Sequence, residues 1–124
     1  MARLLIIDDE PLVRRALRRI LETAGHQITE APDGAAGLTE YFADPHDLVI
    51  CDMVMPVLDG LATLRRLLDA FPGVKLIATS GGSRTSPGSL LDVAARLGAC
   101  ATLDKPLSKA VVLQAVELAL SRAS

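Results

Sequence analysis

The segment Leu48–Pro56, LVICDMVMP, decides the fold. Its first four residues are typical of a buried strand, and Pro56 cannot continue a strand ladder because it has no backbone N–H. The one carboxylate of the segment, Asp52, is therefore expected at the carboxyl end of this strand. In open α/β sheets ligands bind at that edge, because the loops that leave the strands converge there.

Three other apolar runs end in polar residues in the same way. Each has the length of a buried strand, and together they would bring an acidic pair, a hydroxyl and an ammonium to the edge that holds Asp52. The runs and the polar residues at their ends are Leu4–Ile7 with Asp8 and Asp9, Lys75–Thr79 with Ser80, and Ala101–Asp104 with Lys105.

Segments with helical spacing of apolar residues separate the strands, and a short further strand is expected at 26–31. Asp9 and Ser86 are expected to cap the first and fourth helices. Right-handed crossovers between five alternating strands and helices give a doubly wound α/β fold with one parallel sheet. We predict a single domain over residues 1–124 with the flavodoxin-like (βα)5 strand order 2-1-3-4-5, which places Asp8, Asp9 and Asp52 in one cleft. The expected helices cover residues 11–24, 35–42, 61–71, 87–97 and about 109–123.

The composition is that of one domain with an aliphatic core. Of the 124 residues, 50% are hydrophobic and only 2% are aromatic. This length can bury a core without metal ions or disulfides. The net charge of -2 and the absence of a long basic block argue against nucleic acid as a direct partner. Arg14, Arg15, Arg18 and Arg19 have helical spacing, so we expect them on one solvated face of the first helix.

The cysteines and histidines show no metal-binding pattern. Cys51 and Cys100 lie at strand positions and are expected to be buried small hydrophobic residues, which fits a reducing compartment. His26 and His46 lie beside turns and are expected at the surface. No charged leader precedes the first strand, and no apolar stretch has membrane-spanning length. We therefore expect a cytoplasmic protein without a membrane anchor.

Three carboxylates in one cleft repel one another, so we expect them to bind a cation. Two unit charges ~4 Å apart repel by roughly 4 kcal/mol at an effective dielectric constant near 20. A hard divalent ion removes this repulsion, and Mg²⁺ prefers oxygen ligands from one or two carboxylates, water and phosphate. A different interpretation is that Asp8 and Asp9 only cap the following helix.

The hydroxyl and the ammonium favour phosphoryl transfer over capping. By itself, Ser80 before two glycines would be a turn residue, and Lys105 before a proline would be a surface residue. Beside a metal ion, both groups can hold phosphoryl oxygens. The Asp52 carboxylate can then act as the nucleophile that becomes an aspartyl phosphate.

The chain resembles the receiver domains of response regulators in two-component signalling over essentially its whole length. The resemblance implies a signalling switch in which Asp52 accepts a phosphoryl group from a histidine kinase or a phosphotransfer protein. It implies no enzyme activity beyond assistance to the phosphorylation and dephosphorylation of the chain itself. The motifs that carry it are Asp8-Asp9, Asp52-x-x-Met55-Pro56-x-x-Asp59-Gly60, Ser80-Gly81 and Lys105-Pro106.

The same resemblance implies a magnesium site. Asp9, Asp52 and the backbone carbonyl of Val54 would bind Mg²⁺ directly, and Asp8 would act largely through a bound water.

The resemblance also implies roles for the last two strand ends. Lys105 would pair with the phosphoryl group, and the bond between Lys105 and Pro106 would be cis. Ser80 would move to hydrogen-bond the phosphoryl group. Thr79 stays an alternative to Ser80, because the end of a strand is uncertain by one residue. We prefer Ser80 because Gly81 supplies the small residue that follows the switch hydroxyl in the family.

The sequence departs from the receiver pattern in two respects, which involve three positions. Thr102 stands where many receivers have a Tyr or Phe that rotates with the switch hydroxyl. We therefore expect the signal to pass through residues 81–86 and the fourth helix. Val54 and Gly82, two residues beyond Asp52 and Ser80, cannot orient an attacking water. The lifetime of the aspartyl phosphate is then expected to depend on water access alone.

The last helix is apolar over more of its circumference than a core-facing helix needs. We predict a homodimer or a partner contact through this helix and the fourth helix, with ordinary surface hydrophobicity as the alternative. The residues that suit the core are Val112, Ala115, Val116 and Ala119, and those off that stripe are Val111, Leu113, Leu118 and Leu120.

Other functions are alternatives to the switch. One is a degenerate receiver that acts as an interaction or dimerisation module without phosphorylation, although the intact acidic pair, Asp52 and Lys105 argue against it. A hydrolase would need a second acid where Val54 stands. A flavin-binding domain would need a hydroxyl-rich phosphate loop and aromatic side chains. A complete chain of this length would be a stand-alone receiver, whereas an excised one would lack an output or kinase domain.

Overall fold

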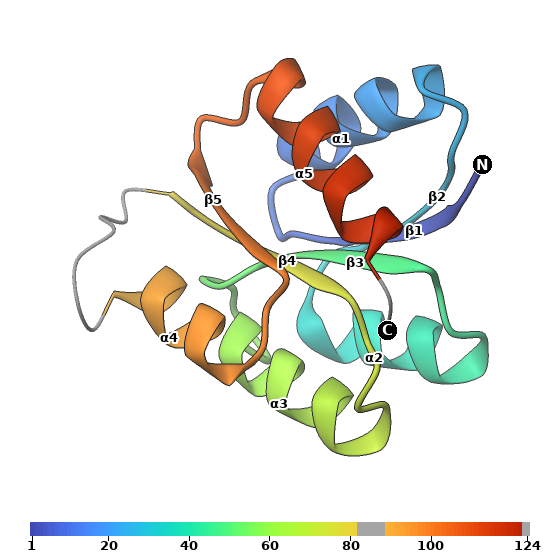
Figure 1. Cartoon of the computed structure of the whole chain (residues 1–124). Helices are drawn as coiled ribbons and strands as arrows, with labels where there is room; N and C mark the ends of the chain where they lie inside the picture. Colours follow the sequence, from blue (N-terminus) through green and yellow to red (C-terminus); the bar gives the residue numbers. More distant parts are fainter. Residues whose placement is uncertain (82–88, 123–124) are drawn as a thin grey trace.

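The structure, a computed structural model, describes residues 1–81 and 89–122 and alternates strands with helices (Figure 1). All strand pairs are parallel, and the strand order is β2-β1-β3-β4-β5. The predicted fold class and strand order are confirmed. The elements are β1 (Arg3–Ile7), α1 (Pro11–Thr23), β2 (Gln27–Ala31), α2 (Gly34–Ala43), β3 (Leu48–Asp52), α3 (Gly60–Ala70), β4 (Leu76–Gly81), α4 (Leu90–Leu97), β5 (Ala101–Lys105) and α5 (Lys109–Ser121).

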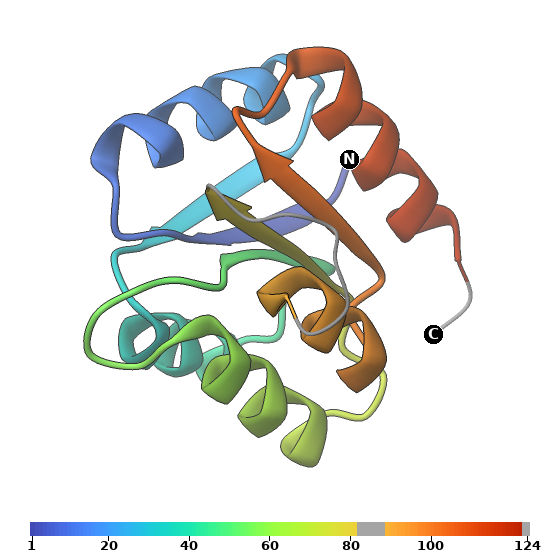
Figure 2. The same cartoon turned by 90° about the vertical axis from the view of Figure 1, so that its left-hand side faces the viewer.

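The helices cover both faces of the sheet, with α1 and α5 on one face and α2, α3 and α4 on the other (Figure 1, Figure 2). Strand side chains alternate between the two faces. In β1, Leu5 and Ile7 pack with the α2–α3–α4 layer, whereas Leu4 and Ile6 pack with α1 and α5. The two cores are almost entirely aliphatic, as the composition predicts.

The central strand β3 fixes where the polar strand ends meet. All five of its residues are buried. Its register pairs Cys51 with Ile7 of β1 and Asp52 with Thr79 of β4. Because the strands are parallel and in register, the residues that follow β1, β3 and β4 reach the same edge of the sheet.

Helix starts follow local capping chemistry, with two corrections to the expectations above. The N-cap of α1 is Glu10, not Asp9, because Pro11 is the first helical residue and holds the residue before it in an extended conformation. The fourth helix begins at Leu90 with Ser89 as its N-cap, and the Ser89 side chain accepts the Asp92 N–H. The expected cap at Ser86 lies outside the described residues.

The arginines of α1 do not share one solvated face. Arg14 and Arg18 both bind the Glu30 carboxylate of β2, and Arg15 and Arg19 are exposed. The hydrogen bond with Glu30 raises the pKa of Arg18, and the hydrogen bond with Arg18 lowers the pKa of Glu30. The prediction was wrong for Arg14 and Arg18, because helical spacing carries no information about the neighbouring strand.

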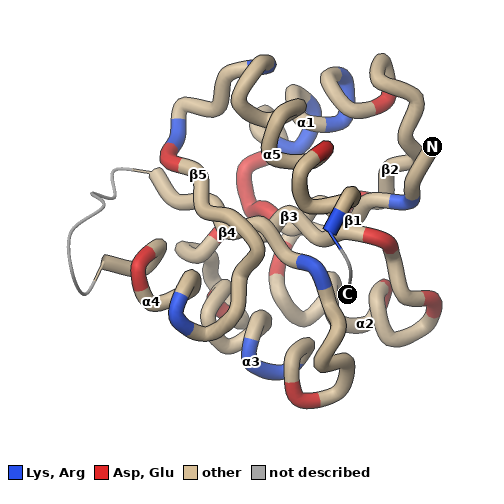
Figure 3. The backbone as a smooth tube through the Cα atoms, viewed as in Figure 1, with Lys and Arg blue, Asp and Glu red and all other residues tan. Residues whose placement is uncertain are grey.

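Lys and Arg positions are spread over several elements, among them α1, α3 and α4 (Figure 3).

His46 is buried, so its expected surface position was wrong. Its side chain sits under the end of α2, where its ring stacks on Tyr41 with 6.1 Å between ring centroids. Nε2 lies 3.2 Å from the Thr29 hydroxyl, and Nδ1 has no hydrogen-bond partner among the described residues. His26 is half-buried, and its Nδ1 accepts the Ala2 N–H. A position beside a turn in the sequence does not show whether other parts of the chain cover the side chain in the fold.

The free energy of unfolding is expected to fall as the pH drops below about 6.5, the usual pKa of histidine. Burial, followed by the charge of Arg3, lowers the pKa of His46 in the folded state, and Asp44 opposes the shift only in part. The unfolded chain therefore binds the proton first, and the stability contributed by neutral His46 is lost as the pH falls. Urea unfolding from pH 7.5 to 5 should show a steeper loss for the wild type than for His46→Gln. His26→Gln, which leaves His46 in place, should keep the steeper loss.

Neither cysteine is in a disulfide; Cys51 is buried and Cys100 is half-buried. Within 1–81 and 89–122, no helix is long and apolar enough to cross a membrane.

Candidate functional site

The strand ends bring a half-buried ammonium and two buried carboxylates together. Lys105 Nζ lies 3.0 Å from Asp8 Oδ2 and 3.4 Å from Asp52 Oδ2. The side chains of Asp8 and Asp52 are 2% and 4% exposed, and that of Lys105 is 13% exposed. Buried charges are costly unless they are paired, so the Lys105 ammonium compensates the charge of the two buried carboxylates.

Backbone hydrogen bonds fix both aspartates at their strand ends. The Asp8 N–H donates to the Ala31 carbonyl and extends the β1–β2 ladder by one residue. Asp8 Oδ1 accepts the Glu10 N–H at 2.9 Å, and Asp52 Oδ1 accepts the Val54 N–H at 3.3 Å. The two carboxylates differ in how firmly they are held, because the contacts of Asp52 with Val54 and Lys105 are both longer than the contacts of Asp8 with Glu10 and Lys105.

The electrostatics of the site keep Lys105 charged. Burial raises the pKa of Asp52, the Lys105 ammonium opposes this, and the charge of Asp8 adds to the rise, so that the net shift is upward. Burial by itself would lower the pKa of Lys105. The hydrogen bond with Asp8 and the charges of both aspartates outweigh burial and raise the pKa of Lys105.

Four carboxylates lie close enough together to bind one cation. Asp8, Asp9, Glu10 and Asp52 each present one ligand atom, and these atoms lie within 4.8 Å of one another. Asp8 and Asp52 are buried whereas Asp9 and Glu10 are exposed, so the group opens to solvent on one side. An all-oxygen donor set with room for water fits Mg²⁺. Glu10 was not among the metal ligands expected from the sequence, although its place directly after Asp8-Asp9 was a signal for it.

The two candidate hydroxyls occupy successive positions of β4. Thr79 and Ser80 are each 1% exposed. Thr79 is the register partner of Asp52, and Ser80 lies one residue nearer the carboxyl edge, opposite Asp104 of β5. Ser80 therefore lies one residue beyond Asp52 toward the edge of the sheet, and the choice of Ser80 over Thr79 stays a prediction. Thr102, the residue that stands in place of an aromatic switch, pairs with Ala78 and is half-buried.

The loop between β3 and α3 folds back tightly on the end of β3. The Gly60 N–H donates to the Met53 carbonyl, and a Cβ on Gly60 would lie 2.3 Å from the Asp52 carbonyl oxygen. Val57 has a φ of 71°, which a β-branched residue rarely adopts. The loop path is therefore set by its anchors at Gly60 and at Asp59, whose side chain accepts the Ala62 N–H.

The bond between Lys105 and Pro106 is cis, as expected.

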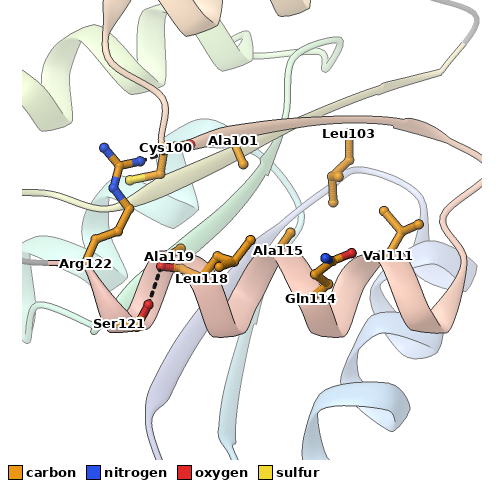
Figure 4. A pocket seen from close by; sticks show the side chains of 10 residues that line it. All are labelled: Cys100, Ala101, Leu103, Val111, Gln114, Ala115, Leu118, Ala119, Ser121 and Arg122. Carbon is orange, nitrogen blue, oxygen red and sulfur yellow. Dashed lines mark hydrogen bonds between the residues drawn. The ribbon is translucent and has the colours of Figure 1, made fainter.

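Two apolar grooves flank β5. One, of about 450 Å³, runs from Glu10 and Lys105 along α1. The other, of about 460 Å³, lies between β5 and α5 and is lined by Leu103, Val111 and Leu118 among others (Figure 4).

Comparison with known proteins gives one family. The family model described as "Response regulator receiver domain" matches residues 4–117. The chain is 31% identical to the transcriptional regulatory protein CseB of Streptomyces coelicolor, over 95% of this chain and 49% of CseB. It is 35% identical to the protein CcdB of Bacillus subtilis, over 94% of this chain and 95% of CcdB. The chain thus spans about half the length of one relative and nearly all of another.

Solved structures show the same relationship. The receiver domain of NtrX from Brucella abortus matches with a TM-score of 0.90 and 27% identity, over 97% of this chain and 99% of that domain. A response regulator receiver domain protein from Clostridium thermocellum matches with a TM-score of 0.88 and 29% identity, over 98% and 96% of the two chains.

Proposed function

Because the chain belongs to the response regulator receiver domain family, we propose that it is a phosphorylation-dependent switch in which Asp52 accepts a phosphoryl group. Receiver domains are generally signalling domains without enzyme activity of their own. The observation that carries the proposal is the Lys105 ammonium, which lies between Asp8 and Asp52 at the open edge of the sheet. We take residues 1–124 as one such domain.

Asp52 is the better nucleophile of the two buried aspartates. Its carboxylate oxygens accept their contacts at 3.3 and 3.4 Å, whereas Asp8 accepts at 2.9 and 3.0 Å. A more weakly held oxygen is easier to free for attack on phosphorus. An Asp52 oxygen would form the new P–O bond, and the P–N bond of a phosphohistidine donor would break, with the histidine leaving as neutral imidazole after protonation.

The remaining residues would hold the transferred group. Asp9, Asp52 and the Val54 carbonyl, with Asp8 through a water, would bind Mg²⁺, which offsets negative charge on the phosphoryl oxygens. The Lys105 ammonium would turn to one phosphoryl oxygen, and the Ser80 hydroxyl would donate to another. The alternative of an interaction module without phosphorylation gains no support from this arrangement, because such a module would not need an ammonium held between two buried carboxylates.

The donor protein is proposed to be a histidine kinase or a phosphotransfer protein that docks on α1. Leu12 is 76% exposed at the start of this helix, beside the groove that ends at Glu10 and Lys105. Arg15 and Arg19 are exposed farther along α1. An apolar groove that leads to the site, bordered by positive charge, suits an acidic, partly apolar helix of a donor protein.

The output face is proposed to lie on α4, β5 and α5. Figure 4 shows side chains from β5 and α5 lining one groove, and its rim includes Val111 and Leu118, which are 46% and 60% exposed. We propose that movement of Ser80 toward the phosphoryl group changes this face and promotes contact with a second copy or another protein. Residues 82–86 of the expected relay lie outside the described residues. Sedimentation should show a phosphorylation-dependent increase in mass that Leu118→Glu abolishes, and a monomer under all conditions would leave these residues as ordinary surface.

Mg²⁺ is expected to stabilise the fold and to be required for phosphorylation. At ten times its dissociation constant, the ion would raise the free energy of unfolding by about 1.4 kcal/mol. Phosphoramidate with Mg²⁺ should add one phosphoryl group to the intact mass, and a chelator should stop the addition. Asp9→Asn should lose most of the stabilisation by Mg²⁺, whereas Asp69→Asn, a change in an exposed carboxylate on α3, should keep it. Equal stabilisation of the two variants would argue against Asp9 as a ligand.

A further inference from the structure

Lys105 contacts a third carboxylate, which the proposed chemistry does not use. Glu10 Oε1 lies 3.1 Å from Lys105 Nζ, about as close as Asp8 Oδ2 at 3.0 Å. The Glu10 side chain is 60% exposed, in contrast to the two buried aspartates. The ammonium is therefore held from the buried side by Asp8 and Asp52 and from the solvent side by Glu10.

Glu10 is placed for this contact by the start of α1. It is the N-cap residue, yet its side chain makes no capping hydrogen bond. At the other four helices of the structure, an Asp or Ser N-cap side chain accepts a backbone N–H. The Glu10 carboxylate instead reaches across to the end of β5. Its N–H donates to Asp8 Oδ1, which fixes its backbone beside the site.

Phosphorylation would change the partners of Lys105 unequally. Asp8 and Asp52 would gain the positive charge of Mg²⁺, so both can release the ammonium without remaining buried and uncompensated. Glu10 belongs to the same carboxylate group but is not among the proposed Mg²⁺ ligands, so its contact with the ammonium is not displaced by the ion. A phosphoryl group that arrives at Asp52 must therefore compete with Glu10 for Lys105.

We propose that Glu10 is a positioning residue that holds the Lys105 ammonium toward the solvent side of the site before phosphorylation and thereby slows phosphorylation of Asp52. This inference rests on the proposed function. It concerns the rate at which Asp52 is phosphorylated. The contact between Glu10 in the first loop and Lys105 at the end of the last strand would lower this rate.

The test measures the rate of phosphoryl incorporation with phosphoramidate and saturating Mg²⁺, by intact mass. In this reaction Asp52 forms the P–O bond, the P–N bond breaks, and ammonia leaves with a proton from solvent. Removal of the Glu10 charge in Glu10→Gln is expected to raise the rate by about twofold to fivefold, the range for an exposed ion pair. Asp104→Asn is the matched control, because it removes an exposed carboxylate next to Lys105 in the same strand.

A second comparison tests whether Glu10 acts through Lys105. In a Lys105→Met background, at a phosphoramidate concentration high enough for this variant to react, Glu10→Gln should give no further gain in rate. A full gain in that background would overturn the route through Lys105 and assign the effect to repulsion of the donor. A Glu10→Gln rate no higher than that of the wild type or of Asp104→Asn would overturn the inference while the proposed function stands. No incorporation in the wild type would overturn both.

Discussion

Replacement of Lys105 by methionine is expected to lower the free energy of unfolding by about 3 kcal/mol when Mg²⁺ is absent. The ammonium is the positive charge beside Asp8 and Asp52, whose side chains are 2% and 4% exposed. Its removal leaves two buried carboxylates facing each other without compensation. Mg²⁺ should restore part of the lost stability, because the ion would supply positive charge at the same place. Urea unfolding with and without Mg²⁺ measures both effects.

The same variant should also accept phosphoryl groups about 100-fold more slowly, because a donor to the transferred oxygens is lost. Lys109→Met is the control, because it removes an exposed lysine on the first turn of α5 and leaves the site charges in place. A Lys105→Met protein as stable as the wild type without Mg²⁺ would show that the buried carboxylates do not depend on this ammonium.

Replacement of Gly60 by alanine is expected to lower the free energy of unfolding by about 3 kcal/mol, although it adds only a methyl group. A Cβ at this position would lie 2.3 Å from the Asp52 carbonyl oxygen and 2.5 Å from Met53 Cα. These are backbone atoms, so no side-chain rotation can relieve the contact. The end of β3 must move, and the rate of phosphorylation should fall by at least about tenfold as Asp52 loses its position.

Gly81→Ala is the matched control for Gly60→Ala. Among the described residues its Cβ would lie nearest to the Lys105 side chain, at 3.6 Å, which is an ordinary contact distance. It should leave stability within about 1 kcal/mol of the wild type, since Gly81 is a strand residue with room for a methyl group. Similar losses in the two glycine variants would contradict this account, because the close contact with the backbone of Asp52 and Met53 exists only at Gly60 and helix and strand propensities favour alanine over glycine.

The fold was predictable because the local and topological signals agree along the chain. Each apolar run stops at a polar residue or a proline, and the helical segments between them leave few ways to connect a parallel sheet. The strand order then places the ends of β1 and β3 side by side. The contact between Lys105 and the two aspartates follows from this geometry, and the distances of 3.0 and 3.4 Å lie in the range of ion pairs.

What the sequence did not predict depends on contacts between distant segments. Glu10 appeared to be one more acidic residue of a loop, and only the position of β5 shows that its carboxylate meets Lys105. Arg14 and Arg18 have the helical spacing of a solvated face, but in the structure both form ion pairs with Glu30 of β2. His46 lies beside a turn in the sequence, yet the end of α2 covers it. Periodicity predicts which face of a helix or strand points inward, but it does not predict which residues of other elements that face contacts.

The most direct test of the central claim is to locate the phosphoryl group. The protein is incubated with phosphoramidate and Mg²⁺ and then reduced with borohydride, which converts an aspartyl phosphate to homoserine, and its peptides are mapped by mass spectrometry. We expect homoserine at position 52 alone, and none in the Asp52→Asn variant or in a sample treated with a chelator. Homoserine at position 8 or 9, or no modification of a folded wild-type protein, would contradict the claim that Asp52 is the phosphoacceptor.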